Sequence, residues 1–133
     1  MVKLIFFLLF CICINSTVHA QASSFDSAGV FTGKPDIPPS HKGGLDNWIK
    51  FLHLNIINRQ DTLEGPITVI VSFVIDEKGN LSGFKTIKDT GKGIVEDVIR
   101  CIKSGPGYLP AMVKGKPVKY RYTETINLET LEN

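Results

Sequence analysis

The side chains best suited to metal binding or covalent chemistry are two histidines and one cysteine, and their spacing supports neither. His41 and His53 are not separated by the intervals at which metal ligands share a helix, and no carboxylate follows at a matching distance. Cys101 falls on the apolar side of a predicted helix, where a small core residue is favoured over a reactive thiol. We therefore expect no metal site and no cofactor, with His53 at the surface and Cys101 in the core.

Two loops carry residue types that bind ions in other settings. Gly91-Lys92-Gly93 opens a predicted helix, where backbone N–H groups can hold an anion, but we favour a tight turn, of which two glycines are typical. Asp76–Asn80 has too few carboxylates for a calcium loop. Nucleophile-elbow and phosphate-loop motifs are both missing from the sequence. We expect a protein that is not an enzyme and takes no small-molecule substrate.

The composition of the chain excludes two further classes of protein. The 133 residues carry a net charge of +2, which is too close to neutral for a nucleic-acid-binding domain with its clustered positive charge. Cys11 and Cys13 lie in the first apolar segment and leave Cys101 alone, so a disulfide framework is excluded. The length fits one domain.

Met1–Ala20 has the layout of a secretory signal peptide. Lys3 precedes the apolar run Leu4–Ile14, and small residues precede a cleavage point after Ala20. The run is shorter than the roughly 20 residues that a membrane-spanning helix needs. We therefore divide the chain into a cleaved signal peptide (1–20), a flexible Ser-, Gly- and Pro-rich lead-in (21–37) and one domain (38–133).

Hydrophobic periodicity predicts an α+β domain. Apolar residues recur at helical spacing in two segments, and three other segments are rich in β-branched and aromatic residues or alternate strictly. The helices should pack on one face of a small three-stranded antiparallel sheet. The expected elements are a helix over Leu45–Ile57, strands over Ile67–Ile75 and Leu81–Lys88, a helix over Gly93–Lys103 and a strand over Val118–Leu128.

The last predicted strand has one apolar and one polar face, with Glu124 as the exception on the apolar face. At a sheet edge, its N–H and C=O groups could pair with an incoming extended peptide, and Lys119 and Arg121 would favour acidic neighbours. The same two basic residues could equally protect the edge from aggregation. The residues alone leave these two interpretations open.

The order and spacing of the turn residues resemble the TonB C-terminal domain. In the first half the resemblance rests on Gly43-Gly44, the run Trp48–Leu52 and Val69–Asp76 followed by Gly79-Asn80-Leu81. In the second half it rests on Ile94–Arg100, then Pro106-Gly107-Tyr108-Leu109-Pro110-Ala111, then Lys114-Gly115-Lys116-Pro117-Val118. The similarity extends over Pro38–Leu128.

The resemblance implies a periplasmic domain of a Gram-negative bacterium, linked to TonB-dependent outer-membrane transport. Members bind the N-terminal box peptide of an outer-membrane receptor by adding it as a strand to their last strand (β-augmentation). On this chain, the implied partner-binding edge comprises Val118, Lys119, Tyr120, Arg121, Tyr122, Thr123, Glu124, Thr125 and Ile126.

Two other functions remain as alternatives. In the first, Met1–Ala20 is retained as a minimal inner-membrane anchor and the protein is a full energy transducer. In the second, the edge strand pairs with a second copy, and the protein is a structural homodimer.

Overall fold

The structure is a computed structural model that describes residues 24–56, 65–90 and 93–128. The predicted signal peptide and Gly91-Lys92 lie outside the described residues. The elements in chain order are β1 (Ser40–His41), α1 (Leu45–Ile56), β2 (Ile67–Ile75), β3 (Leu81–Asp89), α2 (Ile94–Ser104), β4 (Tyr108–Leu109), β5 (Ala111–Val113), β6 (Lys116–Val118) and β7 (Tyr120–Leu128).

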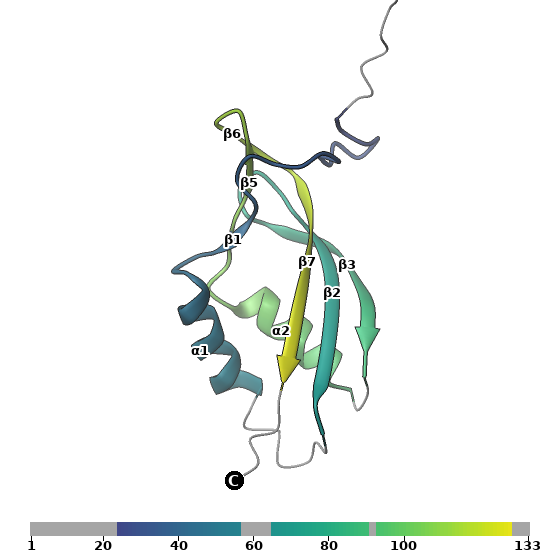
Figure 1. Ribbon diagram of the computed structural model, residues 1–133, viewed down its shortest axis with the longest axis vertical. Coiled ribbons are helices and arrows are strands. Elements are labelled where there is room, and N and C mark those ends of the chain that lie inside the picture. The colour runs from purple at the N-terminus through teal and green to yellow at the C-terminus, as the bar shows by residue number, and fades with distance from the viewer. Residues whose placement is uncertain (1–23, 57–64, 91–92, 129–133) are drawn as a thin grey trace, which may run out of the picture.

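Three antiparallel strands form the main sheet in the order β3-β2-β7 (Figure 1). The dense β-branched run of Ile67–Ile75 is the central strand, as its apolar character on both faces predicts. Two small pairs, β1-β4 and β5-β6, form separate two-stranded sheets. The predicted α+β architecture is confirmed, and the described strands outnumber the three expected.

The core lies between one face of the sheet and the two helices. Every second residue of β2 from Ile67 to Ile75 faces this side and is almost completely buried. These side chains form one cluster with the buried residues of both helices and with Ile126 and Leu128 of β7. The helices therefore cover the same face of the sheet.

The predicted helices are present within one residue at each end. In α2, Cys101 is buried, as expected, and Gly93 precedes the helix in the left-handed conformation. In α1, the core takes Trp48, Leu52 and Ile56, while Leu45 and Ile49 remain 61% and 41% exposed. The apolar residues that recur at helical spacing in this helix thus divide into three that pack in the core and two that remain at the surface. Neither helix in the described ranges is long and apolar enough to cross a membrane.

The turn between β2 and β3 is held by Asp76. Its carboxylate accepts hydrogen bonds from the backbone N–H groups of Lys78 and Asn80 and from the Asn80 side chain. The bond from the Asn80 side chain is the main reason that the pKa of Asp76 lies below its usual value. Gly79 has a φ of +87°, as the predicted hairpin requires.

The pairing of β3 with β2 is irregular. The register shifts between Ile70 and Val71 and again between Ser72 and Val74. Most side chains of β3, including Lys85, Ile87 and Lys88, are exposed. This edge of the sheet is bent and carries lysines, which are features that discourage the pairing of further strands.

The predicted last strand is divided in two. Lys114 and Gly115 both have positive φ and form a tight turn, so Val118 pairs with Ala111 in the β5-β6 hairpin. The chain then leaves this partner and joins β2 from Tyr120 onward. Lys119 lies at the change of partner, which is why one continuous strand over Val118–Leu128 does not form.

Candidate functional site

The outer edge of β7 is the side of the strand that faces away from β2. The carbonyl oxygen of Lys119 points to this side, where it accepts a hydrogen bond of 2.8 Å from the backbone N–H of Phe31. Backbone groups of successive residues in a strand point to opposite sides. The N–H and C=O groups of Thr123, Thr125 and Asn127 therefore also point outward, whereas those of the residues between them bond to β2.

A loop formed by residues 24–32 covers the first position of this edge. Asp26 closes the loop by accepting hydrogen bonds from the N–H groups of Ala28 and Val30, and Phe25 packs edge-to-face on Phe31. Phe31 bridges Tyr120 in parallel orientation and is buried against Ala111 and Val118. Among the described residues this is the pairing found on the outer side of β7, and no described strand pairs with the edge from Thr123 to Leu128.

The two basic side chains of the predicted site point away from the accessible part of the edge. Arg121 extends across the sheet and donates to Ser72 Oγ and to the carbonyl of Gly83. Lys119 donates to the carbonyl of Ala28 in the loop at 3.4 Å. Their positions give no support to the expected preference for acidic neighbours.

The predicted site residues thus divide by position. Val118 lies before the edge, in β6, and Lys119 at the change of partner occupies the first position, which the loop covers. Tyr120, Tyr122, Glu124 and Ile126 belong to the side of β7 that faces the core. The remaining members are on the polar face, and they carry the outward backbone groups: Arg121, Thr123 and Thr125.

On the core side, Glu124 joins a buried polar and aromatic cluster with His41, Trp48 and Tyr108. The Tyr108 hydroxyl donates to Glu124 Oε2 at 3.2 Å, and His41 Nε2 lies 3.2 Å from the same oxygen, although its geometry is not that of a hydrogen bond. The His41 ring stacks on Trp48 with centroids 4.8 Å apart. This cluster connects β1, α1, β4 and β7.

The pKa values of the two tyrosines beside Glu124 are raised. Burial is the main cause for Tyr108, whose pKa lies far above its usual value, and the negative charge of Glu124 adds to it. Burial followed by the same charge raises the pKa of Tyr122. Both phenol side chains therefore remain protonated and neutral in the folded protein. The sequence marked Glu124 as an exception but could not indicate these partners.

A groove of about 290 Å³ runs between α1 and the end of β7. Leu45 and Ile49, two apolar residues of α1 that the core does not use, form its helical wall together with Leu52 and His53. In the part of the chain that the structure describes, no acidic residue, lysine or arginine lines it; the lining residues are Leu45, Ile49, Leu52, His53, Thr125, Ile126, Asn127 and Leu128.

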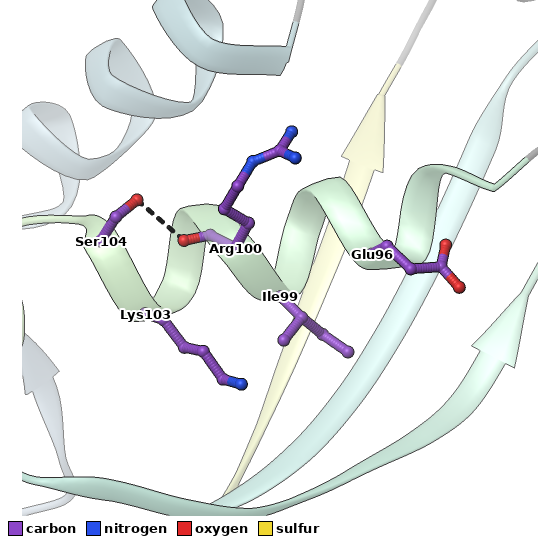
Figure 2. A pocket seen from close by; sticks show the side chains of 5 residues that line it. All are labelled: Glu96, Ile99, Arg100, Lys103 and Ser104. Carbon is purple, nitrogen blue, oxygen red and sulfur yellow. Dashed lines mark hydrogen bonds between the residues drawn. The ribbon is translucent and has the colours of Figure 1, made fainter.

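A second hollow of about 450 Å³ lies on the outer surface of α2 and lacks the properties of a site. Figure 2 shows its side chains diverging, with Arg100 and Lys103 on opposite sides of the helix. Arg100 forms an ion pair with Asp97, Ser104 bonds to the carbonyl of Arg100, and Lys103 lies over the ring of Phe84. Arg100, Lys103 and Ser104 are thus engaged within the domain, and the lining side chains do not converge.

The two histidines and the cysteine lie far apart in their roles and surroundings. His53 is exposed on α1, as expected. His41 lies in the buried cluster described above, and burial raises the pKa of the Cys101 thiol, which keeps it protonated. The described part of the chain brings no three His, Cys, Asp or Glu side chains together as a metal-binding group.

A comparison with protein families identifies the family of this chain. Residues 59–129 match the family described as "Gram-negative bacterial TonB protein C-terminal". The matched stretch contains the central hairpin, α2 and all of β7. No curated protein and no solved structure matches the chain significantly.

Proposed function

Because the chain belongs to the family of C-terminal domains of the Gram-negative bacterial TonB protein, we propose that it is a periplasmic binding module that captures an extended peptide on the outer edge of β7. It has no catalytic role. The proposed partner is the N-terminal box peptide of a TonB-dependent outer-membrane receptor, which joins the sheet as a fourth strand beside β7.

The outward backbone groups of β7 carry this proposal. Thr123, Thr125 and Asn127 offer N–H donors and C=O acceptors beyond the point where Phe31 covers the edge. A strand edge of this kind binds another extended backbone through the pairing that holds the sheet itself together. The opposite edge, β3, is irregular and carries lysines, so it is the poorer template.

An NMR titration tests the proposal directly. Synthetic peptides covering the N-terminal segments of the TonB-dependent receptors of the same organism are added to the isotope-labelled full chain. The amide signals of Thr123, Thr125 and Asn127 should shift most, because their N–H groups change partner. If no peptide of the full set shifts the amide signals of these three residues, the proposal is refuted.

A proline at one outward position separates backbone pairing from side-chain contact. Thr125→Pro removes an outward N–H without breaking the ladder to β2, and we expect it to weaken peptide binding at least about tenfold. Thr125→Val is the matched control, because it keeps the N–H and a similar shape and should bind like the original. The β2 amide signals report whether the proline variant is folded.

The two alternatives are distinguished from the binding module by simple measurements. The mass of the protein isolated from the envelope shows whether it begins at Gln21 or retains Met1–Ala20 as an anchor. Sedimentation over a range of concentrations tests the homodimer, which requires a mass that doubles as the concentration rises.

A further inference from the structure

Building on the proposed function, we propose that α1 forms the side-chain pocket of the peptide site. The added strand must then carry an apolar side chain at the position beside Ile126, where it is buried against Leu45 and Ile49. The partner is thereby specified by chemistry: an extended segment whose core-facing side at this point is a large aliphatic residue.

The apolar surface of α1 exceeds what the core uses. Leu45 and Ile49 are one helical turn apart and lie on one side of the helix. Their side chains are 61% and 41% exposed, although the same helix buries Trp48, Leu52 and Ile56 almost completely. Two large aliphatic side chains are thus left at the surface, next to the strand edge.

The position of the groove matches that of an added strand. Neighbouring strands in a sheet lie about 4.8 Å apart, and their side chains on one face are neighbours. Every second side chain of a strand beside β7 would therefore point toward the helices, as Ile126 and Leu128 do. The groove at this place is lined jointly by these two residues and by Leu45 and Ile49.

The chemistry of the groove selects one kind of occupant. One wall carries the outward backbone groups of Thr125 and Asn127, which only an extended backbone can satisfy as a ladder. Among the described residues the lining offers no carboxylate, so a basic side chain buried there would lose hydration without compensation. His53 is the titratable side chain of this lining, and no described lysine or arginine lies there to pair with an acidic side chain. An aliphatic side chain loses no hydrogen bonds and removes its own surface and that of Leu45 and Ile49 from water.

The test uses two designed peptides and three forms of the full chain, of which two are variants. The first peptide alternates threonine and leucine over about six residues, a typical strand length, and the second replaces every leucine by threonine. The variants are the double substitution Leu45→Gln with Ile49→Gln, the control Leu54→Gln and the unchanged chain. Leu54 is exposed on the same helix and does not line the groove, and glutamine preserves helix propensity at all three positions.

We expect the unchanged chain and Leu54→Gln to bind the leucine peptide about tenfold more tightly than the threonine peptide, as burial of one aliphatic side chain implies. The double variant should lose this preference while the outward amides of β7 still shift with both peptides. A double variant that still prefers the leucine peptide as strongly as the unchanged chain does would overturn the inference and leave the proposed function intact. An absence of β7 shifts with both peptides would refute strand addition itself and the pocket with it.

Discussion

Glu124 is a carboxylate on the side of a strand that otherwise faces the core. Its carboxylate accepts a hydrogen bond from the Tyr108 hydroxyl and lies beside His41, and all three side chains are buried. Buried polar groups of this kind are costly when a partner is removed, because the group left behind has lost its hydration. The effect of a substitution here should depend on which groups it leaves without a partner.

We therefore predict that Glu124→Ala destabilises the protein more than Glu124→Gln. The alanine leaves the buried Tyr108 hydroxyl without its acceptor, at a cost of about 2 kcal/mol. The glutamine keeps a side-chain oxygen that accepts this hydrogen bond and nearly the same volume, at a cost of about 1 kcal/mol. Urea unfolding followed by Trp48 fluorescence measures both, and the reverse order would contradict a structural role for Glu124.

The raised pKa values of Tyr108 and Tyr122 predict how stability depends on alkaline pH. The unfolded chain loses the tyrosine protons near pH 10, whereas the folded protein retains them because the phenolate forms would be buried beside Glu124. The stabilisation is complete below about pH 10 and should be lost progressively above it. Unfolding curves at several alkaline pH values should show this loss, and Tyr108→Phe should reduce it.

The sequence could predict the exception at Glu124 but not its environment. Alternation alone shows that a carboxylate falls on the apolar face. Its two partners are contributed by β1 and β4, two-residue strands that carry no detectable periodicity. The same limit applies to Phe31, whose contact with the chain near Tyr120 depends entirely on the tertiary fold.

At the scale of elements, the β2-β3 turn is held at two points, by Asp76 within the loop and by the close approach of Tyr108 at Gly79. A Cβ on Gly79 would lie 2.6 Å from the carbonyl oxygen of Tyr108, and the residue has a φ of +87°. Both the space and the backbone conformation therefore require glycine at this position.

Gly79→Ala should destabilise the protein by about 3 kcal/mol, because backbone strain and a clash with a carbonyl add together. Gly44→Ala is the matched control: Gly44 has a φ of +86° with no atom within 4 Å of the added Cβ, so only the strain of about 1 kcal/mol remains. Thermal or urea unfolding of the two variants measures the difference. Equal losses would show that the contact with Tyr108 has no energetic weight.

The elements with strong periodicity were predictable, and their arrangement at the ends of the sheet was not. Helical spacing and β-branched runs determine α1, α2 and the central hairpin, because local propensity and burial agree there. The change of partner at Lys119 is different, since it depends on competition between the β5-β6 turn and pairing with β2. The exposure of Leu45 and Ile49 was also unpredictable, because a helical stripe does not reveal how wide its covering surface is.

The whole molecule contains a large core and a smaller, separate cluster. The large core lies between the sheet and the helices, whereas the small one consists of Phe31, Ala111 and Val118 at the end where the β5-β6 hairpin and the lead-in meet (Figure 1). Two such clusters can open independently when few contacts join them.

Phe31→Ala should therefore open the loop of residues 24–32 without unfolding the sheet. We expect hydrogen exchange at the Phe31 amide to accelerate at least about tenfold, because the variant removes the side chain that holds the loop on the edge. Exchange at the β2 amides should remain nearly unchanged. Ile37→Ala provides a control, since Ile37 is exposed in the same lead-in, and faster exchange throughout β2 in Phe31→Ala would contradict the independence of the two clusters.

The two register shifts between β2 and β3 also limit the stoichiometry of any assembly. A strand added beside β3 would have to follow the same bends past its lysines, whereas one added beside β7 meets a regular ladder. Under the proposed function, one edge of the sheet is therefore suited to strand addition. A complex with a receptor segment should stop at one peptide per domain, and two copies joined through β7 would form a closed pair that offers no regular edge for fibre growth.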